Sequence, residues 1–600
     1  MWSSSLLSGR WLRYELRARH TLFGARSGYT RLLRCLRQRV ATVVTAVGRS
    51  QYDCVVVGGG HNGLVCAAYL ARGGRSVLVL EAADEVGGAA VTREFSPGFR
   101  VSACAHLLHS MSGTMMHDLR LEDHGLTFSA REMPTVALSP DGGSIALGAT
   151  TVTASGLASG ATASLTPGAA TSLARGSASP LSSGPTAEEA AAYPGYVGLL
   201  NRLAQALRPL LDSVPPRLGT DAWSDKRALL QLGWQIRRLG RHDMRELLRI
   251  GGMNVFDLLK DNFQSPLLQG ALGFDAVLGT NFGPRSPGSV FTLLYRLASA
   301  AEAHGQECGG VPFAQPKGGL GALSYALAGA AVAAGAEVRT SAAVERILVR
   351  NHRVAGVKLS SGESITAATV ISNVDPKATF LRLLGTEYMD AGFTRRVSHL
   401  RTRGVAAKLH LALDCLPRFT GVSPDALRGR LLIAPSLEYL ERAFNHSKYG
   451  EFSNAPAIEI TVPTLNDPTL APAGKHVLSA VVQYAPYMLK AGWEGGRQQF
   501  ADLVVDTLEQ YSPDLAKSIV CAQLLVPPDI EREFRITGGH WHHAELALDQ
   551  FFMMRPVPGA AQYQTPVDGL YLCGAGCHPG GGVMGTAGRN AARQVLGQAA

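Results

Sequence analysis

A run of glycines after a short apolar stretch is the first feature of this sequence with chemical meaning. Gly58, Gly60 and Gly63 stand at the spacing G-x-G-x-x-G, with His61 and Asn62 between the last two. At this spacing the first glycine permits a tight turn, the second lets the backbone approach a pyrophosphate, and the third allows close helix–strand packing. A helix that begins here would offer unpaired N–H groups and the positive end of its dipole to phosphates. The alternative is a glycine-rich turn with no ligand.

A carboxylate stands where a dinucleotide site needs one. Glu81 ends the next apolar stretch, 18 residues beyond Gly63. At that distance a carboxylate can accept hydrogen bonds from an adenosine ribose. Its charge would repel a 2′-phosphate, so the expected ligand is FAD or NAD and not NADP.

A second glycine pair follows this carboxylate. Gly87 and Gly88 complete the pattern E-x5-G-G, which resembles a signature of flavoproteins of the glutathione-reductase structural superfamily. Adjacent glycines let a second backbone segment approach a long dinucleotide, which favours FAD over NAD. Many members of the superfamily continue with arginine, whereas here the first arginine is Arg93, the candidate for that phosphate contact.

Near the C-terminus, the stretch CGAGCHPGGGVMGTAGRNAA (573–592) combines a glycine-rich loop with a helix that we expect to begin near Val583. Such a helix would point its positive end at a flavin edge that gains negative charge on reduction. His578 is the side chain best placed beside the ring and the only catalytic candidate. The alternative is a histidine fixed by hydrogen bonds in a tight loop.

Four segments give the sequence a specific resemblance. PKGGLGALSYAL (316–327), residues 337–344, VISNVDP (370–376) and the 573–592 stretch resemble the phytoene desaturase-like family of carotenoid and retinoid oxidoreductases. The resemblance implies that the Val344 backbone meets the adenine. It also implies that 574–584 lies along the ribityl chain and pyrophosphate, with N–H groups near Val583 and Met584 facing the flavin C2 carbonyl. The residues expected to bind FAD in this stretch are Gly574, Ala575, Gly582, Val583 and Met584.

The resemblance implies an FAD-dependent oxidoreductase that moves a hydride between a hydrophobic small molecule and flavin N5. Because the flavin performs the redox step, no catalytic triad is required. Two alternatives stay open: a flavin amine oxidase, and a flavoprotein with a regulatory or binding role in mitochondria. The sequence does not indicate the electron acceptor.

Neither a dithiol relay nor a metal site is expected, although a role for Cys573 and Cys577 beside the predicted flavin loop stays open. Dithiol flavoenzymes carry C-x4-C soon after the glycine pair, where this chain has Ala89, Ala90 and Val91. Cys573 and Cys577 lack the second ligand pair of a zinc site. The nine cysteines have no framework spacing and are expected to be free thiols. The triplet His540, His542 and His543 does not suit one metal ion, although a role in the substrate pocket stays open.

These residues need elements that bring them together. Strand, helix and strand are expected within 52–81, the length of one βαβ unit. A helix is expected over 318–335, followed by short strands with turns at Asn351-His352 and Ser361-Gly362. A helical region spans 196–263, in which Pro209 is expected to interrupt the first helix.

The predicted fold is α/β: a Rossmann-like FAD-binding domain of the glutathione-reductase type, assembled from separated segments, with an inserted α+β substrate domain. The FAD-binding segments are 51–140, 311–385 and 541–600. The substrate domain comprises a helical part, 190–310, and a second part, 386–540. Residues 148–187 consist almost wholly of Ala, Ser, Thr, Gly and Pro, and are expected to be a flexible low-complexity insertion.

The first 50 residues hold ten arginines and one acid, so they supply +9 of the formal charge of +10. The basic character therefore belongs to this tail, and no nucleic-acid partner is expected. Rich in Arg, Ser and Leu, residues 1–50 are predicted to be a mitochondrial transit peptide that directs the chain to the matrix. A solvated basic arm is the alternative. The sequence has no apolar run of 18 residues, so no spanning helix is predicted.

Basic residues outnumber acids eight to four over 225–260, with leucines and Trp234 between them. Such a helix could lie at a membrane surface and admit an apolar substrate from the bilayer. A solvated face is the favoured interpretation. Peripheral contact with the inner membrane, or with a mitochondrial protein, is thus left open.

Overall fold

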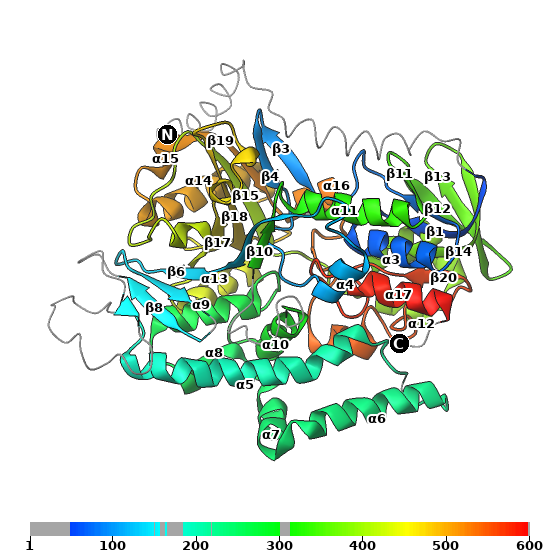
Figure 1. Cartoon of the computed structure of the whole chain (residues 1–600), viewed down its shortest axis with the longest axis horizontal. Helices are drawn as coiled ribbons and strands as arrows, with labels where there is room; N and C mark the ends of the chain where they lie inside the picture. The colour runs from blue at the N-terminus through cyan, green and yellow to red at the C-terminus, as the bar shows by residue number, and fades with distance from the viewer. Residues whose placement is uncertain are drawn as a thin grey trace.

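Two β-sheets lie side by side in the computed structural model, which describes residues 49–148, 150–155, 163–164 (backbone only), 184–217, 219–300 and 313–597. The seven-stranded sheet is on the right in Figure 1 and the nine-stranded sheet on the left. The predicted transit peptide, except for its last two residues, and most of the low-complexity stretch lie outside the described residues.

The seven-stranded sheet is assembled from distant parts of the chain. β1 (Gln51–Val57) lies between β2 (Val77–Leu80) and β14 (Ser364–Ser372) and is parallel to both. Their apolar runs are buried on both faces, as parallel strands require. The other strands are β11 (Glu337–Arg339) beside β2, β12 (Val344–Arg350), β13 (Arg353–Leu359), and β20 (Leu570–Leu572) beside β14. The predicted Rossmann-like architecture is confirmed.

Three helices lie together on this sheet: α3 (His61–Arg72), α11 (Leu320–Ala333) and α17 (Thr586–Leu596). Figure 1 shows them stacked in blue, green and red. A side chain at Gly588 would overlap the carbonyl oxygen of Asn62, so the backbones of α17 and α3 approach each other directly. The two ends of the described chain therefore meet at the glycine turn that opens α3.

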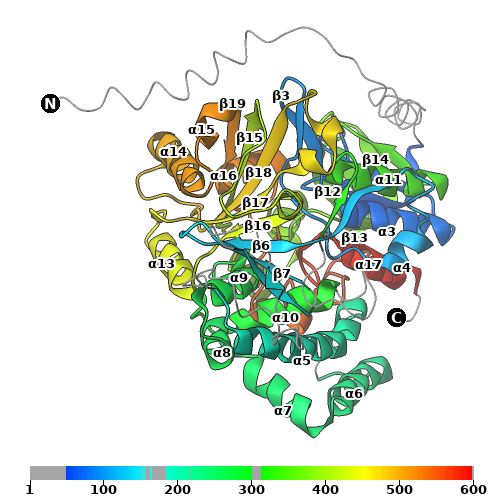
Figure 2. The same ribbon diagram turned by 60° about the vertical axis from the view of Figure 1, so that its left-hand side comes forward.

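The nine-stranded sheet has the order β19-β15-β18-β17-β16-β6-β7-β8-β9. Helix α14 (Trp493–Tyr511) covers one face, and a helical layer covers the other (Figure 2). The strands are β6 (Thr135–Leu138), β7 (Ser144–Leu147), β8 (Val152–Ser155), β9 (Ala163–Ser164), β15 (Ala406–Leu413), β16 (Arg430–Ile433), β17 (Ala457–Thr461), β18 (His476–Gln483) and β19 (Ile519–Leu525). The stretch predicted to be a flexible insertion thus contributes β8 and β9.

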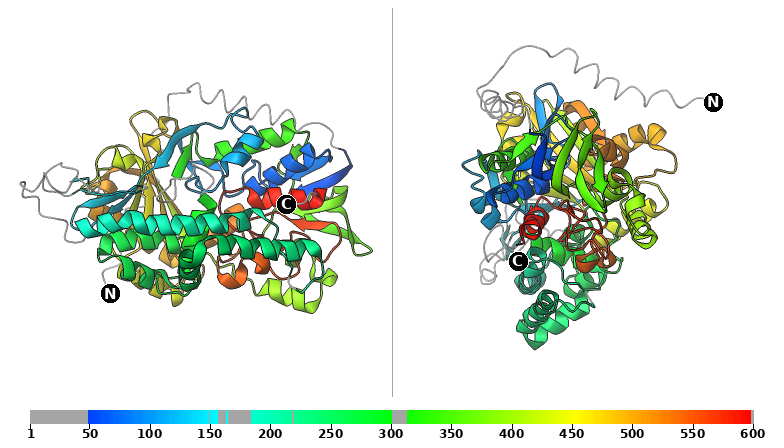
Figure 3. Two further views of the ribbon diagram at one scale, coloured as in Figure 1. Left: turned by 60° about the horizontal axis from the view of Figure 1, so that its bottom comes forward. Right: turned by 90° about the vertical axis from the view of Figure 1, so that its right-hand side faces the viewer.

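The helical layer consists of α5 (Ala187–Asp212), α6 (Trp223–Arg238), α7 (Gly240–Ile250), α8 (Val255–Asn262), α9 (Pro266–Val277), α10 (Ser289–Ala300) and α13 (Leu437–Lys448). The prediction that Pro209 interrupts a helix is wrong, because α5 continues to Asp212. Pro209 lies in the last turn, where its missing N–H removes one bond without breaking a long ladder. Figure 3 shows α6 and α7 projecting beyond α5 at the edge of the molecule.

Shorter elements complete the fold. They are β3 (Thr92–Ser96), β4 (Phe99–Ser102), α4 (Gly113–Asp118), β5 (Phe128–Met133), β10 (Phe313–Pro316), α12 (Ala391–Ser398), α15 (Leu515–Ser518), α16 (Pro527–Phe534) and a π-helical turn, η1 (Ala378–Leu384). The predicted turn at Asn351-His352 is confirmed, since both residues have positive φ between β12 and β13. The C-terminal helix, expected near Val583, begins at Thr586 instead. Gly585, in the left-handed conformation, caps it.

Candidate functional site

A cavity opens at the carboxyl ends of β1 and β2. It encloses about 980 Å³, including its open mouth. Open α/β sheets bind ligands at this edge. Of the residues predicted to bind FAD, those lining the cavity are Gly58, Gly60, His61, Asn62, Glu81, Gly87, Gly88, Val344 and Ala575.

The glycine turn exposes bare backbone to the cavity. Gly58 has a φ of 100°, which favours glycine. A side chain at Gly63 would overlap the Gly58 carbonyl oxygen, so this position serves helix–strand packing and does not line the cavity. The N-cap of α3, Gly60, has no capping side chain. The first N–H groups of α3 therefore have no side-chain acceptor at the helix N-terminus, where an anion is stabilised.

Glu81 is held in place by backbone groups. Its Oε2 accepts from the N–H of Gly59 at 2.7 Å, and its Oε1 accepts from the N–H of Ala83 at 2.8 Å. The Ala342 N–H donates to the Glu81 carbonyl, which brings the loop before Val344 beside this carboxylate. Glu81 and Val344, predicted for the ribose and the adenine, thus border one end of the cavity.

Arg93 does not line the cavity. Its guanidinium pairs with Glu85 at 3.3 Å and Glu533 at 3.6 Å, and stacks on Phe534. The phosphate contact predicted for Arg93 has no support in this placement.

Two other arginines line the cavity: Arg382 of η1, and Arg535, which follows α16. Both are exposed, and neither has an acidic partner among the described residues. No local sequence pattern predicted that these two arginines line the cavity, because tertiary packing alone brings each of them there. The same holds for Phe534 and Trp541. Asn373, by contrast, lies in the VISNVDP segment, and its amide donates to the Gly58 carbonyl at 3.2 Å.

The cavity fits FAD on two observations. First, the cavity wall at Gly60 is bare backbone, which a ligand can approach closely; a Cβ at this position would come within 2.8 Å of the Asn373 amide nitrogen. In addition, three lining side chains bury a polar atom without a protein partner: His61 Nε2, Asn62 Oδ1 and His543 Nδ1. Buried polar groups are normally satisfied, so these atoms indicate a polar ligand. Burial lowers the pKa of both histidines to about 4, which keeps them neutral near pH 7.

The C-terminal loop reaches the cavity only in part. Ala575 lines it, while Gly574 packs tightly on the Asn373 backbone. The Gly582 backbone lies against the His61 ring, which is a cavity wall. Val583 and Met584 do not line the cavity, and Met584 is buried with Tyr295 and Leu546.

His578 also lies off the cavity. Its Nε2 is 2.7 Å from the Leu210 carbonyl oxygen, and its ring contacts Phe551 and Phe552. Burial lowers its pKa to about 3. These contacts favour a histidine fixed in a tight loop over a catalytic group.

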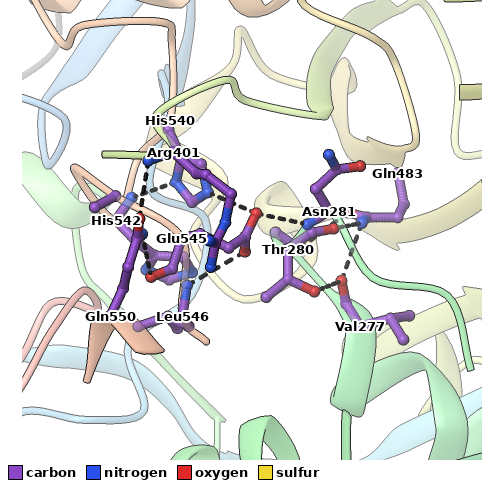
Figure 4. Close-up of polar contacts among 12 residues, drawn as sticks. Val277, Thr280, Asn281, Arg401, Gln483, His540, His542, Glu545, Leu546 and Gln550 are labelled. Atoms are coloured by element: carbon purple, nitrogen blue, oxygen red, sulfur yellow. Dashed lines mark hydrogen bonds and ion pairs between the residues drawn. The ribbon is translucent and has the colours of Figure 1, made fainter. Parts of the chain in front are cut away.

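The histidine triplet does reach the site, through His543 and its neighbour Trp541. The buried Glu545 anchors this segment: its Oε2 is 3.6 Å from His540 Nε2 and accepts from the Asn281 N–H at 3.1 Å. Figure 4 shows this network joining the triplet to the end of α9 and to Gln483 of β18. The segment therefore links the cavity to the nine-stranded sheet.

Arg555 holds this segment against the C-terminal loop. Its side chain is fully buried and donates only to backbone carbonyls. The six acceptors are the carbonyl oxygens of His542, Ala544, Glu545, Gln550, Ala575 and Cys577. No local pattern predicted this role, because the acceptors come from two separate loops.

A buried polar row crosses the nine-stranded sheet on the face that packs against the helical layer. Lys408 Nζ lies 2.6 Å from His106 Nδ1 and donates to Ser479, and burial lowers its pKa to about 8. His106 in turn is 3.7 Å from Glu459, which accepts from Arg430. Lys408 does not line the cavity.

In the described parts of the chain, no three His, Cys, Asp or Glu side chains are grouped to hold a metal ion. The seven described cysteines are free thiols, as predicted. None of the described helices has the length and apolar character to cross a membrane.

Known proteins share both sequence and fold with this chain. A sequence profile of flavin containing amine oxidoreductases matches residues 63–596. "Pyridine nucleotide-disulfide oxidoreductase domain-containing protein 2" of Mus musculus is 36% identical, with 91% of this chain and 94% of the relative covered. A limonene dehydrogenase polypeptide of Castellaniella defragrans is 26% identical, with 91% of this chain and 94% of the relative covered.

Two further likenesses are more distant. A phytoene desaturase of Cereibacter sphaeroides is 28% identical over 45% of this chain and 51% of its own. The solved structure of putrescine oxidase bound to putrescine is 15% identical, covers 91% of this chain and 98% of its own, and has a TM-score of 0.55. The first of these agrees with the resemblance seen in the sequence, and the second shares the fold.

Proposed function

This chain belongs to the flavin containing amine oxidoreductase family, and from that premise we propose that it is a mitochondrial enzyme acting on a hydrophobic organic substrate. It is an FAD-dependent oxidoreductase. FAD, when bound, supplies the group that accepts or donates a hydride. The observation that carries the proposal is the uncapped N-terminus of α3, which faces a cavity walled by glycine backbone and by buried polar atoms without partners.

The chain's own residues then have distinct roles. The N–H groups of His61 and Asn62 would donate to the pyrophosphate, where the helix dipole would add stabilisation. Glu81 would accept from the adenosine ribose, and the Val344 backbone would hold the adenine edge. Arg382 and Arg535 balance the phosphate charge from the mouth of the cavity, a role that the sequence had suggested for Arg93. Arg555 fixes the loop bearing Ala575, which orients the flavin end of the site.

A hydrophobic substrate fits the residues at the flavin end. Phe534, Ile536 and Trp541 line the cavity and supply apolar surface for such a substrate. The names of two relatives, limonene dehydrogenase and phytoene desaturase, specify unsaturated hydrocarbons. Of the two carboxylates that line the cavity, Glu81 is assigned to the ribose, and Asp375 already accepts from the Ala378 N–H and from the N–H and hydroxyl of Thr537, so neither is assigned to a cationic substrate.

The test is spectroscopic. The purified chain should show flavin absorbance, and under anaerobic conditions a panel of unsaturated hydrocarbons should bleach it, while matched amines should not. Bleaching by amines, with release of peroxide in air, would establish the second candidate, a flavin amine oxidase. The family profile and the aromatic lining are compatible with that candidate. A chain that holds FAD but reacts with neither panel would be a flavoprotein with a binding role.

The proposed mitochondrial localisation rests on the composition of residues 1–50, which hold nine more positive than negative charges. Fused to a fluorescent protein, these residues should direct it into the matrix. A matched control that replaces Arg10, Arg13 and Arg17 with Gln should stay largely in the cytosol. Equal import of both fusions would contradict the proposal.

A further inference from the structure

Exposed apolar side chains of the described chain gather on one projecting part of the molecule. Eight large ones are exposed, and four of them lie on α6 and α7: Trp223 (72% exposed), Leu230 (67%), Trp234 (64%) and Leu248 (74%). Single exposed apolar residues need no explanation, whereas a group rimmed by polar residues marks an interaction site. Figures 1 and 3 show that these two helices stand away from both sheets.

Three of these side chains form a stripe along α6. At about 100° of rotation per residue, Trp223, Leu230 and Trp234 fall within about 40° of arc. Leu229, Leu232 and Ile236, on the opposite side, are half-buried. The helix is therefore apolar on two faces, and only one of them faces the protein.

The orientation of α6 is fixed from within. Asp225 is buried and accepts from the Arg217 backbone at 3.1 Å and from the Gln562 amide at 3.0 Å. At the other end of the hairpin, Asp243 of α7 accepts from Arg202 at 2.6 Å. The stripe therefore cannot turn inward without breaking these anchors.

Cations flank the stripe on both sides. On the same helical count, Lys226 and Arg237 lie about 40–60° to one side, and Arg227 and Arg238 lie about 40–60° to the other. Lys226 pairs with the exposed Asp221, but the three arginines have no acidic partner among the described residues. Arg241 and Arg245 on α7 also lack one. A second copy of this chain would bring the same cations face to face, so charge disfavours self-association.

We infer that the outer face of α6, with its Trp–Leu stripe and flanking arginines, docks on an anionic lipid surface. Tryptophan and leucine enter the boundary between headgroups and acyl chains, while the arginine stems extend toward lipid phosphates. An anionic bilayer supplies both the apolar layer and the negative charge that this face matches. The inference is independent of the FAD site, since no residue of the face lines the cavity.

The test uses the full chain and vesicles of two compositions: phosphatidylcholine alone, and equal parts phosphatidylcholine and phosphatidylserine. Co-sedimentation should be strong only with the anionic vesicles, and should weaken at about 0.5 M salt. Arg227→Gln/Arg237→Gln should reduce the affinity about 25-fold, at about fivefold per cation. The matched control Arg350→Gln/Arg395→Gln, at exposed arginines elsewhere, should change it less than twofold.

A second readout separates α6 from the basic N-terminal tail, which would also attract anionic vesicles. Brominated acyl chains should quench tryptophan fluorescence, and Trp223→Phe/Trp234→Phe should remove that part of the quenching which α6 contributes. Flavin absorbance and melting temperature report whether each variant is folded. Unchanged affinity and quenching in the α6 variants would overturn the inference, as would equal binding to neutral vesicles. A lipid-independent dimer that the tryptophan substitutions dissociate would assign the face to a second copy instead.

Discussion

At the scale of single residues, Gly60 is the sharpest probe of the cavity. Its φ of −71° is open to any residue, so a substitution acts through the side chain and not through backbone strain. Its Cβ would meet the Asn373 amide, a group that can move, and would occupy space beside the turn.

We therefore expect Gly60→Val to fold with a nearly unchanged melting temperature in the absence of FAD, but to retain less than a tenth of the wild-type flavin absorbance. Gly495→Val is the matched control, because its Cβ meets nothing within 4 Å. Normal flavin content in Gly60→Val would contradict the assignment of this cavity.

Arg555 is the residue on which the loops around the cavity depend. Replacing it with Met leaves six carbonyl oxygens without their donor, and each buried group left unpaired costs about 1–3 kcal/mol unless water reaches it. We expect Arg555→Met to lower the free energy of unfolding by at least about 3 kcal/mol. Urea unfolding checks this. Arg401→Met, at an exposed arginine paired with Asp549, should cost less than about 1 kcal/mol. Equal losses in the two variants would refute the role given to Arg555.

Sequence patterns predicted a site residue correctly where its role depends on residues close to it in the chain. The turn at Gly58 and the carboxylate at Glu81 are local features, and the cavity forms between them. Arg382, Arg535 and Arg555 act across loops far apart in sequence, so no spacing indicated them. His578 had the right local context for a flavin contact, but its ring contacts the end of α5 instead.

At the scale of elements, the contact between α3 and α17 closes the seven-stranded half of the molecule. Gly588 lets the two backbones touch, and a side chain there meets Asn62 backbone that cannot yield. The strand–helix–strand unit and the C-terminal helix were predicted from short patterns. The contact between α3 and α17 was not predicted, because a glycine or alanine in a glycine-rich chain does not indicate which other helix it will pack against.

Gly588→Ala should therefore destabilise the protein by about 1–3 kcal/mol, as overpacking does, although alanine favours helices. The same change at Gly495 of α14, where space is open, should stabilise it by about 0.5–1 kcal/mol. Thermal unfolding of the two variants should shift in opposite directions. A stabilised Gly588→Ala would show that the helices are less closely packed.

At the scale of the whole molecule, buried histidines make stability depend on pH. Burial lowers the pKa of His61 and His543 to about 4, and of His109, His410 and His578 to about 3. Between these values and 6.5 the unfolded chain binds more protons than the folded one. Stability is therefore fully present only well above pH 6.5, and it falls as the pH drops through 6.5 toward 4.

We expect the urea midpoint to fall steeply between pH 7 and pH 5.5, with uptake of several protons on unfolding. Each histidine contributes up to about 1.4 kcal/mol per pH unit. His410→Gln should reduce the slope of the free energy of unfolding against pH by the equivalent of about one proton. The control His399→Gln, at a histidine with an exposed side chain, should leave that slope unchanged. A flat profile above pH 5.5 would contradict the burial of these rings.

β20 and α17 belong to the seven-stranded half of the fold but are synthesised long after the strand and the helix that they join, and this has a consequence for biogenesis. A ribosome must pass residue 572 before β20 can join β14, and residue 596 before the whole of α17 can meet α3. A chain that stopped after residue 540 would lack both elements and should be colourless, so cofactor capture can only follow the synthesis or import of residues 570–596.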